Sequence, residues 1–124
     1  MPFKYENLEV WQLAIELIGK YYQLLKGFPE HEQYALASQG RRAAVSVALN
    51  IAEGSGRSTD KDFGLFINRA MTSLLESDAV LKIALKLGYI RRPDYDSLQP
   101  LLEKVYYKLV AFEKTLRKDT RART

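Results

Sequence analysis

The chain has 124 residues, of which 47% are hydrophobic and none is cysteine, and its formal net charge is +4. This length predicts one domain, the hydrophobic content excludes a largely disordered chain, and the lack of cysteine excludes disulfides and thiolate chemistry and fits a reducing cytoplasm. No apolar run approaches the roughly 20 residues of a membrane span, and Glu6, Asn7 and Glu9 interrupt the N-terminal segment where a signal peptide needs an apolar stretch.

The first helix is expected between Leu8 and Lys26. Apolar residues recur there at steps of three and four, which is typical of a core-facing helix stripe. They are Trp11, Ala14 or Ile15, Ile18, Tyr21 or Tyr22, and Leu25. Asn7 can cap this helix, and Gly27 followed by a proline is a helix stop. We expect a single helical turn in the short polar connection that follows, residues 29–34.

The second helix is expected to begin near Leu36 and to be deeply buried. At about 100° per residue a narrow polar stripe runs along it, while most of the remaining circumference is Ala, Val, Leu and Ile. The stripe consists of Gln39, Arg42, Ser46, Asn50 and Glu53. These side chains either form a hydrogen-bonded network that fixes helix register or subunit contacts, or they line a ligand pocket or a central channel. Ser73 and Glu76, one turn apart further along the chain, are interpreted as a packing and capping pair.

The tripeptide Gly54-Ser55-Gly56 is expected to end the second helix, since glycine is common just past a helix C-terminus. Ser58 or Thr59 can cap the helix that follows. Thr59 and Asp62 have the spacing of a capping box, which strengthens this prediction.

Two interpretations of this turn remain open. Backbone N–H groups at the start of the third helix, with the hydroxyls of Ser58 and Thr59 and the guanidinium of Arg57, can hold a phosphate. Alternatively, the glycines only turn the chain, and Arg57 pairs with Glu53 or Asp78. The second interpretation is the favoured one, because the spacing is neither that of a dinucleotide fingerprint nor that of a P-loop.

The third helix is expected over residues 60–87, with Gly88 at its end. Its apolar seam consists of Phe63, Ile67, Ala70, Leu74, Leu81 and Leu85. Asp78 interrupts this seam, and a carboxylate in such a place is costly without a partner. We expect a cation or a donor on another helix to meet it, with Arg42 and Arg57 as candidates.

The fourth helix is expected after a linker of residues 89–92, with Pro93 and Asp94 at its start. Its apolar repeat consists of Leu98, Leu102, Val105, Leu109, Phe112 and Leu116. Beyond this repeat the periodicity is lost, so we expect one domain over residues 1–118 and a frayed basic tail over residues 119–124. Four helices with short connections predict an all-α, antiparallel up-down-up-down four-helix bundle.

The apolar residues exceed what one bundle core requires. The second helix is apolar on far more than one stripe, and other helices carry extra apolar residues off their seams. These are Leu13, Leu17, Leu65, Val80, Ile83 and Leu87. Such a surplus predicts surfaces buried between subunits, and therefore self-association, without indicating the number of subunits.

Residues that could support catalysis are sparse. The single histidine, His31, lies in a polar connection without a second histidine or a cysteine, and it is interpreted as exposed and inert. No serine has an obvious base in the sequence, and no acidic cluster has metal-ligand spacing. We therefore expect no catalytic residue, no metal or cofactor site, and no enzymatic activity.

Basic residues are the main candidates for a binding surface. The positions considered for nucleic acid are Arg41, Arg42, Arg57, Lys61, Arg69, Arg117, Lys118, Arg121 and Arg123. Phosphate contacts would use these cations, and an oligomer would multiply them. The alternative for the C-terminal cations is structural, because positive charge at a helix C-terminus opposes the helix dipole.

The segment Asn50-Ile51-Ala52-Glu53-Gly54, followed by Gly56-Arg57, resembles the signature of the S23 family, also called the 23S rRNA intervening-sequence proteins. Further matching positions are Leu8, Val10-Trp11, Phe28-Pro29, Glu32, Leu36, Gln39, Arg42-Ala43-Ala44, Ser46, Asp62-Phe63, Phe66, Ala70, Ser73 and Glu76. The chain departs from the family pattern at Gly40, Thr72 and Ser77.

This resemblance implies a small four-helix bundle that assembles as a homopentamer and has no established enzymatic activity. With the charge pattern, it predicts a non-catalytic oligomer whose ligand is RNA or another nucleic acid. The alternative is a structural interaction protein whose partner is another polypeptide.

Overall fold

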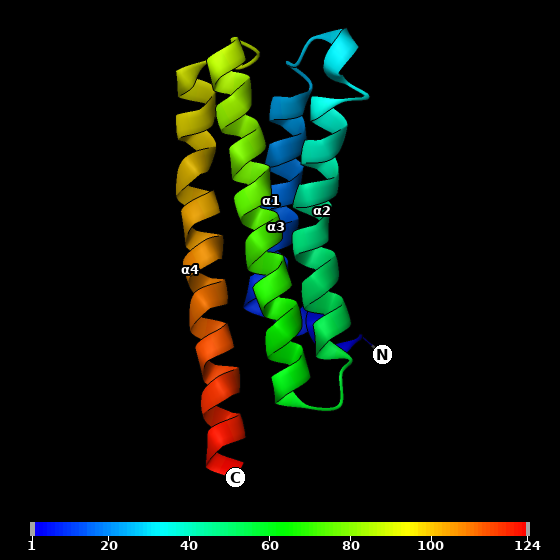
Figure 1. Cartoon of the computed structure of the whole chain (residues 1–124), viewed down its shortest axis with the longest axis vertical. Coiled ribbons are helices and arrows are strands. Elements are labelled where there is room, and N and C mark those ends of the chain that lie inside the picture. The colour runs from blue at the N-terminus through cyan, green and yellow to red at the C-terminus, as the bar shows by residue number, and fades with distance from the viewer. Residues whose placement is uncertain (1, 124) are drawn as a thin grey trace.

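The structure is a computed structural model that describes the backbone of residues 2–123 and the side chains of residues 2–118. The described elements are two short 3₁₀ helices, Lys4–Asn7 and Glu30–Glu32, and the α-helices α1 (Glu9–Leu25), α2 (Leu36–Ser55), α3 (Asp60–Leu87) and α4 (Arg92–Arg123). Within this part of the chain there is no β-strand. Successive helices run in opposite directions, and α1 and α3 each pack against both α2 and α4 (Figure 1). The predicted antiparallel up-down-up-down bundle is confirmed. No helix of the described residues is long and apolar enough to cross a membrane.

Helix α3 has the predicted bounds because both of its end signals operate. The Thr59 side chain accepts a hydrogen bond from the backbone N–H of Asp62 at 3.1 Å, which caps the first turn. At the other end Gly88 has φ = 77°, the left-handed conformation that glycine adopts without a steric penalty. The predicted cap of α1 is wrong, however, because Leu8 occupies the N-cap position and Asn7 ends the preceding 3₁₀ helix.

Helix α2 ends within the predicted glycine tripeptide, although for a different reason. Gly56 has φ = −89°, which any residue can adopt, and Gly54 lies inside the last turn of α2, where it is buried. A Cβ atom on Gly54 would lie 2.7 Å from the Cβ of Phe66 and 2.8 Å from the Cδ1 of Phe63. Gly54 is therefore needed for the close approach of α2 to α3 and not for a left-handed turn.

The core is formed by side chains of all four α-helices, and the central ones are fully buried. Tyr21 of α1 is among them, and its hydroxyl donates to the backbone carbonyl of Ser77 on α3 at 2.8 Å. A Cβ atom on Gly40 would lie 2.7 Å from this hydroxyl. Two of the three departures from the family pattern, Gly40 and Ser77, therefore contact the same buried tyrosine.

The apolar surplus divides between the core and the surface. Leu17 and Val80 belong to the core, so their prediction as extra surface residues is wrong, and Leu13 is partly buried against it. The exposed large apolar residues on α2 and α3 are Leu49, Leu65, Leu75, Ile83 and Leu87. Much of the predicted surplus thus remains uncovered in one chain.

Helix α4 is longer than the apolar repeat that predicted it. Its backbone is helical through Arg123. The side chains of residues 119–123 and the whole of Thr124 lie outside the described part of the chain. The frayed tail over residues 119–124 stays a prediction.

Candidate nucleic-acid interface

The polar stripe of α2 is connected to α3 by a small hydrogen-bonded network. The hydroxyls of Ser46 and Ser73 lie 2.9 Å apart, and the side-chain amide of Asn50 donates to the carbonyl and the hydroxyl of Ser46 at 2.8 Å and 2.9 Å. These three side chains are half-buried between the two helices. The interpretation of the stripe as a network that fixes helix register fits Ser46 and Asn50.

The remaining stripe residues point elsewhere. Gln39 and Arg42 are exposed, and Glu53 binds Arg57 at 3.3 Å. Of the predicted packing and capping pair, Ser73 packs between the helices through its bond to Ser46, whereas the Glu76 side chain is exposed. The stripe therefore has a structural half in the α2–α3 interface and a solvent-facing half.

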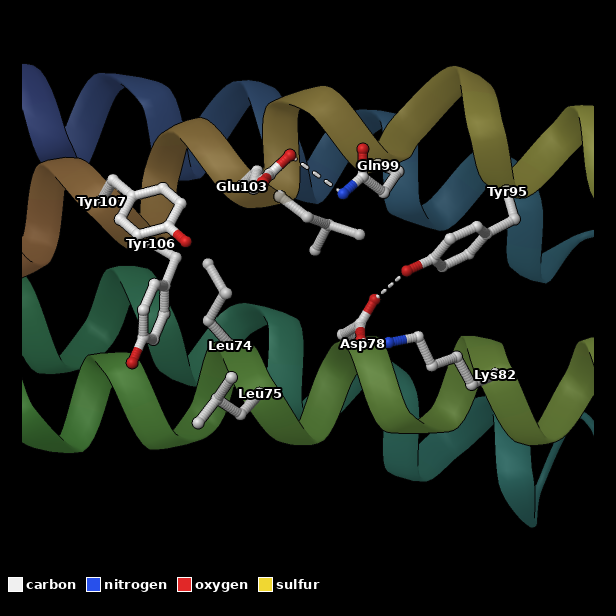
Figure 2. Close-up of a pocket in the computed structure, with 10 residues that line it drawn as sticks. Leu74, Leu75, Asp78, Lys82, Tyr95, Gln99, Glu103, Tyr106 and Tyr107 are labelled. Atoms are coloured by element: carbon white, nitrogen blue, oxygen red, sulfur yellow. Dashed lines mark hydrogen bonds and ion pairs between the residues drawn. The ribbon is translucent and has the colours of Figure 1, made fainter.

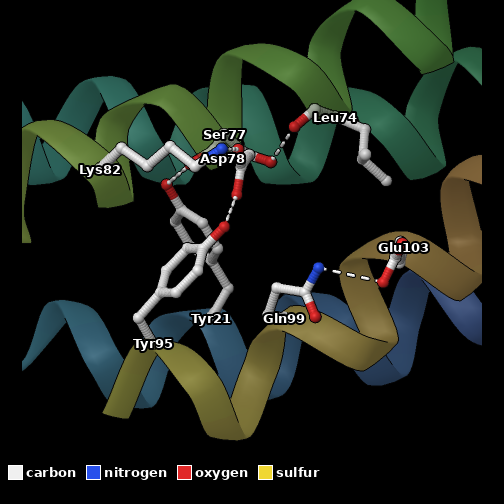
Figure 3. A network of polar contacts seen from close by, with 8 residues as sticks. All are labelled: Tyr21, Leu74, Ser77, Asp78, Lys82, Tyr95, Gln99 and Glu103. Carbon is white, nitrogen blue, oxygen red and sulfur yellow. Dashed lines mark hydrogen bonds and ion pairs between the residues drawn. The ribbon is translucent and has the colours of Figure 1, made fainter. Parts of the chain in front are cut away.

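Asp78 has the predicted donor on another helix, but the donor is a tyrosine. The Tyr95 hydroxyl on α4 donates to the Asp78 carboxylate at 2.6 Å, and the Lys82 ammonium lies 3.0 Å from the other oxygen (Figure 3). Arg42 and Arg57 are wrong as candidates, because Asp78 lies in the α3–α4 interface and both arginines belong to α2 and the turn after it. Burial and the neighbouring Asp78 carboxylate raise the pKa of Tyr95, so this phenol stays a hydrogen-bond donor.

A groove of about 310 Å³ lies beside this pair, between α3 and α4 (Figure 2). Its apolar wall consists of Leu74, Leu75, Leu102, Tyr106 and Tyr107, and its polar wall of Asp78, Lys82, Tyr95, Gln99 and Glu103. The polar groups bind one another, since Gln99 donates to Glu103 at 3.0 Å and Asp78 is held as described above. This arrangement suits an apolar side chain of a partner better than a reacting group.

The predicted basic positions fall into two groups at opposite ends of α2. Arg57 follows α2, and Lys61 and Arg117 line one hollow between the start of α3 and the last turns of α4. The α2–α3 turn and the C-terminal end of α4 lie at the same end of the bundle (Figure 1). We call this end the basic end: its cations are Arg57, Lys61, Arg69, Arg117 and Lys118, and the carboxylates of Glu53, Asp60 and Glu113 lie among them.

Arg41 and Arg42 do not belong to the basic end, because they lie near the N-terminus of α2. Arg41 donates to the backbone carbonyl and to the side-chain oxygen of Gln33, and it therefore fixes the connection before α2. Arg42 is exposed in a shallow hollow together with Tyr22 and Leu49. These two candidate positions therefore lie at the other end of α2 from the turn that precedes α3.

Within the basic end, two arginines pair with acidic residues one turn away. Arg57 lies 3.3 Å from Glu53, and the Arg117 Nε lies 2.8 Å from the largely buried carboxylate of Glu113. No ion pair joins Lys61, Arg69 or Lys118 to another described side chain. These three cations are therefore available to an anionic ligand, while the side chains of Arg121 and Arg123 lie outside the described part of the chain.

The geometry of the α2–α3 turn and of His31 agrees with the structural interpretations of both. Arg57 binds Glu53, as the favoured interpretation of the turn expects, and the Thr59 hydroxyl is occupied by the N–H of Asp62. His31 is exposed, with its ring edge-on to Tyr89. No group of three potential metal ligands occurs among the described residues.

Phe66 is the residue of this end that sequence reasoning missed as a contributor. Its ring is buried, and the guanidinium carbons of Arg57 and Arg69 each lie 4.5 Å from the ring centroid. The i, i+3 spacing of Phe66 and Arg69 on one helix was the available signal.

These observations define a four-helix bundle with a group of cations at one end, a groove between α3 and α4, and no recognisable catalytic constellation in its described part. A family model described as 23S rRNA-intervening sequence protein matches residues 6–111, and the chain belongs to this family. The crystal structure of a protein of unknown function from the S23 ribosomal protein family of Bacteroides thetaiotaomicron has the same fold, with a TM-score of 0.77 and 23% identity over 85% of this chain and 98% of that chain. No curated protein is similar in sequence to the chain.

Proposed function

We propose that this protein is a non-catalytic, cytoplasmic homo-oligomer, a pentamer, that binds RNA through its basic end. The observation that carries the proposal is the concentration of Arg57, Lys61, Arg69, Arg117 and Lys118 at one end of a bundle whose family is described by 23S rRNA intervening sequences. RNA is a dense polyanion, and each phosphate that a cation neutralises releases a counterion, which favours binding.

Self-assembly is supported by the apolar residues that one chain leaves uncovered. On the face formed by α1 and α2, Leu49 is 62% exposed beside Tyr22 and the half-buried Val45. Burial of such side chains stabilises an interface by about 25 cal/mol per Å² of apolar surface. We expect this face to take part in the subunit contact, so Leu49→Glu should dissociate the oligomer while each chain stays folded.

Assembly and nucleic acid binding can be tested on one sample by native mass spectrometry combined with the ultraviolet absorbance ratio that reports bound nucleic acid. A pentamer that carries nucleic acid supports the proposal, whereas a monomer contradicts the assembly. A pentamer that neither copurifies with RNA nor binds added RNA contradicts the RNA-binding part.

The contribution of the tail can be tested by reversing Lys118, Arg121 and Arg123 to glutamate. Arg117 is left unchanged because it neutralises the largely buried Glu113. RNA affinity should fall steeply and lose part of its salt dependence, since phosphate contacts are removed. Unchanged affinity would exclude the tail as the contact.

The second candidate function is a scaffold that binds another protein and no nucleic acid. The α3–α4 groove favours it, because Leu75 and Tyr107 on its apolar wall are 52% and 61% exposed. Salt-sensitive retention on immobilised RNA separates the two candidates, since a protein-binding scaffold would not be retained.

A further inference from the structure

Two arginine guanidinium groups lie over the ring of Phe66 at the basic end. It lies in the second turn of α3 and is only 7% exposed, although its neighbours on the surface are charged. The guanidinium carbons of Arg57, from the α2–α3 turn, and of Arg69, one turn further along α3, are each 4.5 Å from the ring centroid. Cations over an aromatic face are attracted by the ring quadrupole, so Phe66 holds both arginines near one another.

The segment that resembles the family signature, residues 50–57, builds this arrangement. Gly54 provides the space for Phe66, since a Cβ atom on residue 54 would lie 2.7 Å from the Phe66 Cβ. Glu53 binds the Arg57 guanidinium at 3.3 Å and restrains it over the ring. The sequence suggests no common role for Glu53, Gly54 and Arg57. In the structure, Gly54 makes room for Phe66 and Glu53 binds Arg57, so that Arg57 lies over the Phe66 ring.

The two guanidiniums keep hydrogen-bonding capacity for a ligand. A guanidinium has five N–H donors, so one that lies over a ring keeps donors for other partners, and its planar fork matches a phosphate group. The Arg69 side chain makes no hydrogen bond or ion pair with any other described side chain, and Arg57 is 45% exposed despite its pair with Glu53. The distance between the two guanidinium carbons cannot exceed twice their distance to the ring centroid, so their charges repel and a bound anion relieves this repulsion.

Pre-organisation distinguishes this pair from ordinary surface arginines. A free arginine loses side-chain entropy when it binds a phosphate, whereas one held over a ring has already lost much of this freedom on folding. A strand of RNA presents phosphates in sequence, so it can engage both guanidiniums at once.

We propose that Arg57, Phe66 and Arg69 form a clamp that holds backbone phosphates of RNA, with Phe66 as the platform and the two arginines as the donors. This inference rests on the proposed RNA binding and assigns it to a defined site. The clamp contacts phosphates and not base edges, so it contributes affinity and register without base preference.

The test measures the affinity of the intact protein for a fluorescein-labelled RNA hairpin over a series of salt concentrations. The variants are Arg57→Gln, Arg69→Gln and Phe66→Leu. Arg92→Gln is the matched control, because Arg92 also lies over an aromatic ring, Tyr95 at 5.9 Å, and pairs one turn away with Asp96 at 3.1 Å. Arg92 begins α4, at the end of the bundle opposite the basic end (Figure 1).

Each of the two arginine variants should weaken binding about threefold to tenfold and lower the slope of log affinity against log salt by about 0.7–0.9, as expected for the loss of one phosphate contact. Arg92→Gln should bind like the unchanged protein although it loses the same charge. Phe66→Leu should also weaken binding although the net charge is unchanged, and its circular dichroism and oligomer mass establish that it folds.

An equal loss of affinity in all three arginine variants would overturn the clamp, because net charge alone would explain it. Full affinity of a folded Phe66→Leu variant would overturn the role of the platform. Displacement of the hairpin by inorganic phosphate beyond what chloride does at equal ionic strength would mean that the site binds free phosphate, which also overturns the inference. If the unchanged protein binds no RNA, the proposed function itself fails, and this result is distinct from the others.

Discussion

The close contact between α2 and α3 at Gly54 yields a sharp stability prediction. Replacing Gly54 with alanine adds a single methyl group to the last turn of α2. This methyl carbon would lie 2.7 Å from the Cβ of Phe66, an atom that cannot move without its backbone, and 2.8 Å from the ring carbon Cδ1 of Phe63. Helices α2 and α3 must therefore separate locally, which displaces the Phe66 side chain, and the Phe63 ring must move with them or change rotamer.

Two opposing effects determine the size of the change. Overpacking of a tight interface costs about 1–3 kcal/mol, while alanine in place of glycine in a helix gains about 0.5–1 kcal/mol. We expect Gly54→Ala to lower the free energy of unfolding by about 1–2 kcal/mol. Because the displaced ring is the platform of Arg57 and Arg69, the same variant should also weaken RNA binding.

The measurement is urea denaturation followed by circular dichroism at one fixed protein concentration, since oligomers are stabilised by mass action. Gly19→Ala is the control, because Gly19 lies inside α1 and a Cβ atom there has no other atom within 4 Å. Gly19→Ala should raise the free energy of unfolding by about 0.5–1 kcal/mol. If the two variants are stabilised alike, the steric argument for Gly54 is wrong.

Three further predictions concern the buried polar groups. Asp78→Asn should lower stability by about 1 kcal/mol in urea denaturation, because a charge-assisted bond from Tyr95 becomes a neutral one, and an unchanged midpoint would refute this. Burial raises the pKa values of Tyr21 and Tyr95 above the ordinary 10.0. The stabilisation that the two neutral phenols contribute is therefore complete below pH 10.0 and is lost as the pH rises above it. A pH series of melting temperatures should show a steep alkaline decline that is smaller in Tyr95→Phe. Gly40→Ala should lower the free energy of unfolding more in the unchanged protein than in a Tyr21→Phe background, because the nearest atom to the added methyl is the Tyr21 hydroxyl at 2.7 Å. Strict additivity of the two stability changes would contradict this.

Local signals in the sequence predicted the architecture well. The bounds of α3 follow from a threonine cap and a glycine with positive φ, both of which act within a few residues of the helix end. The apolar repeats of α3 and α4 predicted most of the residues that these two helices contribute to the core, because helical periodicity alone decides which residues share a face. Such features need no knowledge of the other helices.

The features that sequence reasoning missed depend on contacts between helices. Asp78 has its partner on α4, and spacing within α3 cannot indicate that Tyr95 faces it. Arg42 and Arg57 are near in sequence but lie at opposite ends of a helix of 20 residues. The role of Gly54 depends on two rings of α3, so a glycine that resembles a turn signal has a packing function.

The same tight packing connects the fold with the proposed interface. Glycines at positions 40 and 54 of α2 let a tyrosine of α1 and two phenylalanines of α3 approach the helix backbone closely. At Gly40 the ring that approaches is buried, and its hydroxyl is consumed by the Ser77 carbonyl. At Gly54 one approaching ring, Phe66, faces the charged end of the bundle and carries two guanidiniums whose donors are directed to solvent or to a single carboxylate. Gly40 therefore has a packing role alone, whereas Gly54 also makes room for the ring of the proposed clamp, which is why a stability variant at Gly54 and a binding variant at Phe66 should have coupled effects.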